Sequence, residues 1–215
     1  MNVIIPAIIP QSFEHLDDAL RIAGEFTHEV QIDIVDGHFV PFTSWPYRGG
    51  GSVMLLSKYA STFEIEVDLM IAEPEKALLL YIEAGVQKVI VHLESVTNLN
   101  TILSHHASHH YELGFSIRND TPLSTLSDVI EKADYIQLMG IRNIGSQGQP
   151  FDTKVLSRIK ILRESYPELL ISIDGSVNAE TLPQLRAHGA NRFISGSAIF
   201  EASSPKDAYQ TLTAL

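Results

Sequence analysis

The chain has 215 residues, of which 45% are hydrophobic and 19% are charged, and its formal net charge is −11. This length and composition predict one large domain, residues 1–215, with a substantial hydrophobic core. The chain has no cysteine, which excludes disulfides, thiolate metal sites and a cysteine nucleophile. The acidic balance, with no basic face in the sequence, argues against a nucleic-acid-binding protein.

The N-terminal segment, MNVIIPAIIPQSF, has no basic region, and Pro6 and Pro10 interrupt its short apolar run. It therefore does not have the pattern of a signal peptide. No segment approaches the roughly 20 apolar residues that a membrane span requires. We expect a soluble, cytoplasmic protein with no membrane contact.

Eight short runs rich in Ile, Val and Leu follow one another along the chain, as is typical of strands covered on both faces. These predicted strands are 3–9, 30–35, 63–71, 88–94, 113–119, 135–141, 169–174 and 192–200. Helix-like segments alternate with them at 12–26, 51–60, 73–85, 122–133, 152–166, 178–189 and 204–215. Such an alternation is typical of a single (β/α)8 TIM barrel, of the α/β class. A doubly wound open sheet is the alternative.

Polar side chains collect near the carboxyl ends of these strands, where the active site of such a barrel lies. Gln31 and Asp33 share one side of the second strand because the side-chain period is two, and Asp68 and Asp174 lie comparably on the third and seventh strands. We expect these four groups to converge. Three carboxylates lie together only where a divalent cation, shared protons or an arginine compensates their charge. Asp36 is better interpreted as a residue that orders its loop.

Four further segments carry weaker signals. DGSV (174–177) and SGSAIF (195–200) lie at the ends of the seventh and eighth strands, where barrel enzymes usually bind phosphate. GSQGQ (145–149) either folds over a ligand or is an ordinary flexible loop. HHASHH (105–110) offers i,i+4 histidine pairs that could bind a metal, but its place in the outer helical ring favours a solvated helix face.

Several motifs match a known family in order and spacing. They are DIVDGHFVP (33–41), VDLMI (67–71), VHLES (91–95), NDTPL (119–123), LM (138–139), GQPF (148–151), IDGSVNAET (173–181) and GSAIF (196–200). Through them the chain resembles the ribulose-phosphate 3-epimerases along nearly its whole length. The resemblance implies an isomerase that interconverts ribulose 5-phosphate and xylulose 5-phosphate at C3, in the pentose phosphate part of carbohydrate metabolism. It also implies a phosphosugar ligand and a homo-oligomer.

The resemblance also implies roles for individual residues. In this family two aspartates on opposite faces of the sugar remove and return the C3 proton, while a divalent metal holds the enediolate intermediate. Carried over, the acid and base are Asp33 and Asp174, and the metal ligands are Gln31, Asp33, Asp68 and Asp174. The implied substrate contacts are Ala7, Met70, Met139, Gly175, Ser176, Gly196 and Ser197, with loop contacts from Arg142, Gly145 and Gly148.

The chain departs from the family pattern at several of these positions. Gln31 and Asp68 replace two histidine ligands, and Ser176 replaces the second glycine of DGG. The first strand reads PAIIP instead of PSILS, and RNIGSQG replaces NPGFGG. An all-oxygen ligand set suits magnesium, manganese or calcium better than zinc. We expect one divalent metal ion, either Mg or Mn or the Zn that the resemblance implies, with a metal-free site as the alternative.

Three alternatives to the epimerase follow from these departures. The chain could act on another phosphosugar, since the changed first strand and sixth-strand loop touch substrate contacts. It could also bind a phosphosugar without turnover, or be a non-catalytic interaction protein built on a barrel. The orotidine decarboxylase and hexulose-phosphate synthase group does not fit, because its DxKxxD signature requires a lysine and the second strand here reads DIVD.

Overall fold

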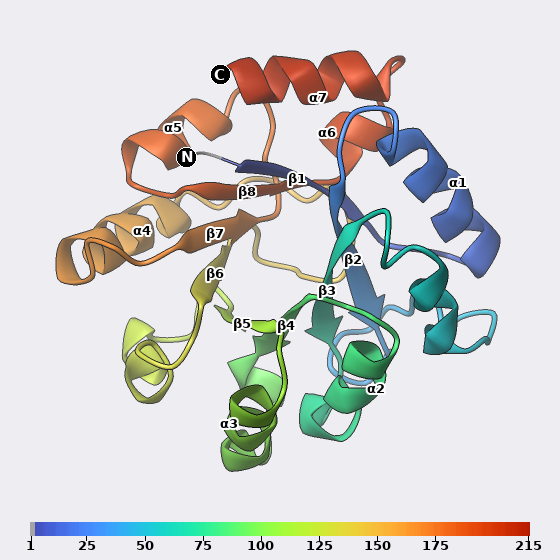
Figure 1. The fold of residues 1–215 in the computed structure, drawn as a ribbon. Coiled ribbons are helices and arrows are strands. Elements are labelled where there is room, and N and C mark those ends of the chain that lie inside the picture. Colours follow the sequence, from blue (N-terminus) through green and yellow to red (C-terminus); the bar gives the residue numbers. More distant parts are fainter. Residues whose placement is uncertain (1–2) are drawn as a thin grey trace.

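The computed structural model describes residues 3–215, and its strands form a closed barrel in chain order from β1 to β8. The strand pairs are parallel, and β1 closes the barrel by pairing with β8, with Val3 opposite Arg192 and Pro6 opposite Ser195. Figure 1 shows the helices arranged around the outside of this barrel. The predicted (β/α)8 barrel is therefore confirmed, and the open sheet is wrong because the β1–β8 pairing closes the sheet.

The eight strands lie within the predicted runs or within one residue of them. Their bounds are β1 Val3–Ile8, β2 Glu29–Val35, β3 Glu64–Met70, β4 Lys88–His92, β5 Glu112–Ile117, β6 Tyr135–Met139, β7 Ile171–Asp174 and β8 Arg192–Ser195. The prediction of strand 192–200 is wrong in its second half, because the chain turns at Gly196 and the backbone N–H of Phe200 donates to the carbonyl of Gly196. Residues of this stretch form a short helix instead, since a short apolar run does not distinguish strand from helix.

The helices cover the outside of the barrel. The α-helices are α1 Phe13–Ala23, α2 Leu78–Glu83, α3 Leu99–Ser108, α4 Lys154–Ser165, α5 Leu182–Ala187, α6 Ser197–Phe200 and α7 Pro205–Ala214. The 3-10 turns are η1 Val53–Lys58, η2 Pro74–Lys76, η3 Leu93–Ser95 and η4 Leu123–Asp128. The helices predicted near 51–60 and 122–133 are therefore 3-10 turns, closed by i→i+3 bonds such as Tyr59 N–H to the carbonyl of Leu56. Within residues 3–215, no helix is long and apolar enough to span a membrane.

The alternation of side chains along β2 shows how the strands serve two environments. Val30, Ile32 and Ile34 belong to the main apolar core between the barrel and its helices. Burial of each such side chain contributes roughly 1.5–3 kcal/mol to stability. Gln31 and Asp33 face the barrel interior, where Gln31 reaches Asp174 of β7. The apolar face of the strand thus holds the fold together, and its other face is free to carry polar groups.

Candidate active site

Three aspartates meet inside the barrel near the carboxyl ends of β2, β3 and β7. Asp33 and Asp68 lie opposite each other in the β2–β3 register, and Asp174 is the last residue of β7. One carboxylate oxygen of each lies within 4.8 Å of the other two, and all three residues are buried. Together with Gln31, the four groups converge as the sequence predicts.

The amide of Gln31 lies between two of these carboxylates. Its Nε2 donates to Oδ1 of Asp33 at 2.8 Å and to Oδ2 of Asp174 at 3.2 Å. Among the residues that the structure describes, its buried Oε1 has no hydrogen-bond partner. Gln31 therefore links carboxylates from two different walls of the barrel, β2 and β7, and leaves one acceptor free.

Asp68 has its own partners, which the sequence interpretation did not place in the site. The Nε2 of Gln137, on β6, donates to Oδ2 of Asp68 at 3.0 Å. The Nε2 of His92, the last residue of β4, lies 3.0 Å from Oδ1, but outside hydrogen-bonding alignment, so this contact is mainly electrostatic. Because side chains alternate along a strand, Gln137 lies on the same side of β6 as Met139, a predicted substrate contact. This alternation is the sequence signal that could have placed Gln137 in the site.

Burial dominates the electrostatics of the cluster. It raises the pKa of Asp174 to about 7, and the nearby charge of Asp68 adds to the effect. Burial, followed by the charge of Asp174, also raises the pKa of Asp33 well above its ordinary value. Burial acts to lower the pKa of His92, but the contact with Asp68 and the charges of Glu94 and Asp174 together outweigh burial, and the net shift is upward. The site therefore holds protons that separate carboxylates would have released.

The residues present fit a divalent cation. Three carboxylates have ligand atoms at mutually compatible distances, and Gln31 Oε1 is a buried acceptor without a partner in the described part of the chain. This donor set consists of oxygen atoms, which suits a hard cation such as Mg²⁺ or Mn²⁺. His92 lies beside Asp68 as a neighbour of the cluster.

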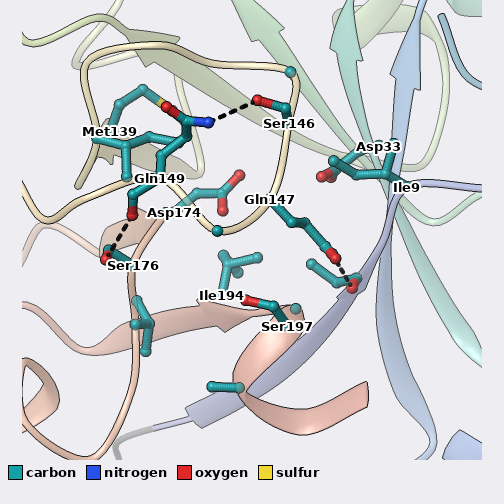
Figure 2. A pocket seen from close by; sticks show the side chains of 18 of the residues that line it. Ile9, Asp33, Met139, Ser146, Gln147, Gln149, Asp174, Ser176, Ile194 and Ser197 are labelled. Atoms are coloured by element: carbon teal, nitrogen blue, oxygen red, sulfur yellow. Dashed lines mark hydrogen bonds between the residues drawn. The ribbon is translucent and has the colours of Figure 1, made fainter. Parts of the chain in front are cut away.

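A cavity of about 270 Å³ opens directly onto this cluster. Figure 2 shows Asp33 and Asp174 on either side of it, with Met139 and Ser146 at one end and Ile194 and Ser197 at the other. The predicted substrate contacts that line it are Ala7, Met70, Met139, Gly175, Ser176, Gly196 and Ser197, together with the loop residues Gly145 and Gly148. Arg142 does not line it and lies in a neighbouring recess with Arg118.

Segment 145–149 lines this cavity. Its Gln147 donates from Nε2 to the carbonyl of Ala7 at 3.3 Å, and Ser176 Oγ donates to the carbonyl of Gln149 at 3.0 Å. A Cβ at Gly196 would lie 2.2 Å from Gln147 Nε2. Glycine at this position thus lets the loop approach the floor of the cavity. The sequence identified this segment but not the individual glutamines.

Two other predictions concern residues outside the cavity. Asp36 accepts from the backbone N–H groups of His38, Phe39 and Ala72, at 2.8, 3.0 and 2.8 Å, so its role in ordering the loop is confirmed. The HHASHH segment lies on and just beyond α3, on the outside of the barrel. Within residues 3–215, the group of side chains able to hold a metal is the aspartate cluster, and it includes none of these histidines.

A closed barrel with an acidic, oxygen-rich cluster and a glycine-lined cavity at the carboxyl ends of its strands defines an enzyme of the TIM-barrel class. A sequence model of the ribulose-phosphate 3 epimerase family matches residues 3–200, and the chain belongs to this family. The family assignment places the chain among the isomerases, in the epimerase class. The family and enzyme class predicted from the sequence are thus confirmed.

Curated relatives span almost the whole chain. Ribulose-phosphate 3-epimerase from Mycobacterium leprae is 29% identical and covers 98% of this chain and 93% of the relative. The protein of the same name from Bacillus subtilis is 29% identical, with 97% and 96% covered. The cytoplasmic isoform from Oryza sativa is 26% identical, with 97% and 92% covered.

Solved structures share the fold at lower identity. KGPDC from Streptococcus mutans has a TM-score of 0.72 and 16% identity, with 99% of this chain and 95% of that chain covered. A 3-hexulose-6-phosphate synthase has a TM-score of 0.71 and 18% identity, with 100% and 99% covered. At these identities the likeness concerns the barrel fold alone.

Proposed function

We propose that the chain is a 3-epimerase of ketose phosphates that interconverts ribulose 5-phosphate and xylulose 5-phosphate, or a closely related pair. The observation that carries this proposal is the placement of Asp33 and Asp174. They reach one cavity from β2 and β7, strands separated in the barrel by β1 and β8. Two acid/base groups on different walls are what inversion at one carbon requires.

The two aspartates divide the proton transfer between them. One carboxylate removes the C3 proton from one face of the sugar and keeps it, and the other carboxyl, already protonated, donates its own proton to C3 from the opposite face. A single base would return the proton to the side it came from. Gln31 donates to both carboxylates, so it holds them in a fixed relation across the reacting carbon.

The remaining residues bind and orient the substrate. Asp33, Asp68, Asp174 and Gln31 Oε1 would hold a divalent cation, which when bound supplies Lewis acidity to the substrate carbonyl oxygen. His92 and Gln137 fix the orientation of Asp68. Backbone N–H groups around Gly175–Ser176 and Gly196–Ser197, which line the cavity, would bind the phosphate.

A second candidate function is phosphosugar binding without turnover. The observation that favours it is the Gln31 amide, whose Nε2 already occupies the space between Asp33 and Asp174. An amide in this place compensates the two carboxylates without a cation. The two candidates differ in whether a bound metal restores turnover.

The test begins with elemental analysis of untagged protein purified without chelator. Turnover of ribulose 5-phosphate to xylulose 5-phosphate is then measured with Mg²⁺, Mn²⁺, Zn²⁺ or no added metal, and C3–H exchange is followed in D₂O. We expect turnover with a hard cation and a loss of about 10³-fold in Asp33→Asn and Asp174→Asn. Asp18→Asn, on the exposed face of α1, is the control. Wild-type turnover in Asp33→Asn would contradict the assignment, and phosphosugar binding with neither metal nor turnover would favour the binding protein.

A further inference from the structure

A second recess lies beside the active-site cavity and has no role in the proposed chemistry. It has a volume of about 340 Å³ and lies between loop 39–42 after β2 and loop 142–149 after β6. Arg118, which follows β5, and Arg142 both line it. We call it the arginine recess and define it by Phe39, Arg118, Arg142, Ser146 and Gln149.

The charge of the arginine recess is opposite to that of the chain as a whole. The formal net charge of the chain is −11, yet the described residues that line the recess include two arginines and no acidic side chain. Glu94, which follows β4, accepts hydrogen bonds from the backbone N–H of Arg118 and from the hydroxyl of Thr121. The recess is therefore a local positive site on an acidic protein.

The two guanidinium groups have little to bind within the chain. Across residues 3–215, Arg142 forms no ion pair and no side-chain hydrogen bond, and it is exposed. Arg118 lies over the Phe39 ring at 4.7 Å and donates one long bond, 3.5 Å, to the carbonyl of Phe39. Its Nε is buried and lacks a partner among the described residues. An unpaired buried donor of a charged group is costly unless a ligand satisfies it.

We propose that the arginine recess binds a phosphate or carboxylate group, with Arg118 and Arg142 as its ligands. Guanidinium groups match the geometry of both oxyanions, because each presents several N–H donors in one plane. The side chains of Phe39, Val40 and Ile144 form apolar walls, which exclude water and strengthen the attraction between the charges.

The recess adjoins the active site closely enough for one molecule to reach both. Ser146 and Gln149 line both spaces, and Gln149 Nε2 donates to Ser146 Oγ at 3.1 Å, a hydrogen bond drawn in Figure 2, so this pair lies between the two spaces. On the other side, the Phe39 ring lies 5.5 Å from the ring of His92, which contacts Asp68. The anionic group is therefore either the second charged end of a related ketose bisphosphate, an interpretation that rests on the proposed function, or a separate small anion.

The test compares the wild type with Arg118→Gln, Arg142→Gln and the control Arg48→Gln by isothermal titration calorimetry. Arg48 lies in an adjoining hollow of the same rim, is exposed, and has no ion pair among residues 3–215. The probes are inorganic phosphate, ribulose 5-phosphate and ribulose 1,5-bisphosphate. Thermal denaturation verifies that each variant is folded, and the exposed Arg142 gives a variant with little influence on folding.

Two results support the proposal and identify the source of the anion. A loss of about 10-fold or more in affinity for the bisphosphate, with ribulose 5-phosphate unchanged, identifies the second charged end of a ketose bisphosphate. If the wild type binds inorganic phosphate at two sites, and both Arg118→Gln and Arg142→Gln bind it at only one, the recess binds a separate small anion. Unchanged binding of all three probes, or an equal loss in Arg48→Gln, overturns the proposal. If the wild type does not bind ribulose 5-phosphate, the proposed function fails, while the phosphate titration still tests the recess.

Discussion

The two ends of the barrel interior both carry charged residues, but they arrange them in opposite ways. At the amino end, Glu66 accepts from Arg192 at 2.8 Å and from the Tyr135 hydroxyl at 2.6 Å, and Arg192 lies 4.2 Å over the Tyr135 ring. Lys88 lies 2.7 Å from Glu29. At the carboxyl end, within residues 3–215, the aspartate cluster has no arginine or lysine partner, only amides and one histidine.

This difference distinguishes charged residues that stabilise the fold from charged residues that are retained for a ligand. A buried charge with an opposite partner needs nothing from outside the chain, and removing the partner is costly. Like charges that are brought together lower the stability of the fold, and such groups are retained where a ligand uses them. The amino end therefore contributes to holding the barrel, while the carboxyl end costs stability, as expected of a ligand site.

The largest effect is expected from breaking the paired end. Arg192→Met leaves the buried Glu66 carboxylate without its cation, and we expect a loss of about 3–5 kcal/mol in the free energy of unfolding. Urea denaturation measures it. The double variant Glu66→Gln/Arg192→Met is the control and should lose less than the single variant, because no charge is left unpaired. Equal losses in both would show that the charge pairing contributes nothing.

The reverse is expected at the carboxyl end. In metal-free protein at pH 8, Asp33→Asn removes a buried acid whose pKa is raised well above its ordinary value, so the variant should be more stable than wild type. We expect a gain in the free energy of unfolding, because the buried carboxyl binds its proton more tightly in the folded than in the unfolded chain. Urea denaturation in the presence of EDTA measures it. A loss of stability would mean that the carboxylate supports the fold.

The dependence of stability on pH follows from Asp174. Its pKa in the fold is about 7, against 3.8 ordinarily, so between these values the folded state holds a proton that the unfolded state has released. The stabilisation is complete below about pH 4 and is lost as pH rises through about 7. The melting temperature of metal-free wild type, relative to Asp174→Asn, should fall over this range, by about 2–4 °C for each kcal/mol lost.

The same titration with a metal provides the control. Because a cation binds the deprotonated carboxylates, added Mg²⁺ or Mn²⁺ should reduce the fall at high pH in wild type and have little effect in Asp174→Asn. The raised pKa of Asp174 would be contradicted if the difference in melting temperature between wild type and Asp174→Asn stayed constant with pH, both with and without metal.

A smaller effect than that of Arg192→Met is expected from Asp36, a carboxylate at the carboxyl end of the barrel whose role is structural. Asp36→Ala removes three hydrogen bonds to backbone N–H groups, and we expect a loss of about 2 kcal/mol in the free energy of unfolding. Metal affinity of the aspartate cluster, measured by calorimetry, should change little. A large loss of metal affinity would place Asp36 in the site.

The sequence predicts those parts of the site that depend on position within one strand. Period-two alternation places Gln31 and Asp33 on one side of β2, and strand-end position brings Asp174 to the same end of the barrel. The contacts of His92 and Gln137 with Asp68 were not predictable in this way, because they depend on how β3, β4 and β6 are staggered around the closed sheet. A single sequence contains no direct signal of that stagger.

Local backbone geometry was a second reason why the structure could not be predicted fully from the sequence. Segment 51–60 has helical patterning, yet only Val53–Lys58 is helical, and as a 3-10 turn. The turn begins after Gly49, Gly50 and Gly51, all at positive φ, a conformation that glycine adopts readily and that departs from an α-helix. The arginine recess was likewise beyond prediction, because loops after β2, β5 and β6 form it jointly.

The Gln31 bridge to Asp174 has a consequence for how the enzyme is produced. It joins residues 143 positions apart, so synthesis of the chain delivers β2 long before β7, and such distant contacts form slowly. A divalent cation held by the proposed ligands would bind only when both strands are in place, so it would be a ligand of the folded state alone and would favour barrel closure. The yield of folded enzyme should then follow the divalent cation content of the growth medium, and a chelator in the lysis buffer should lower it.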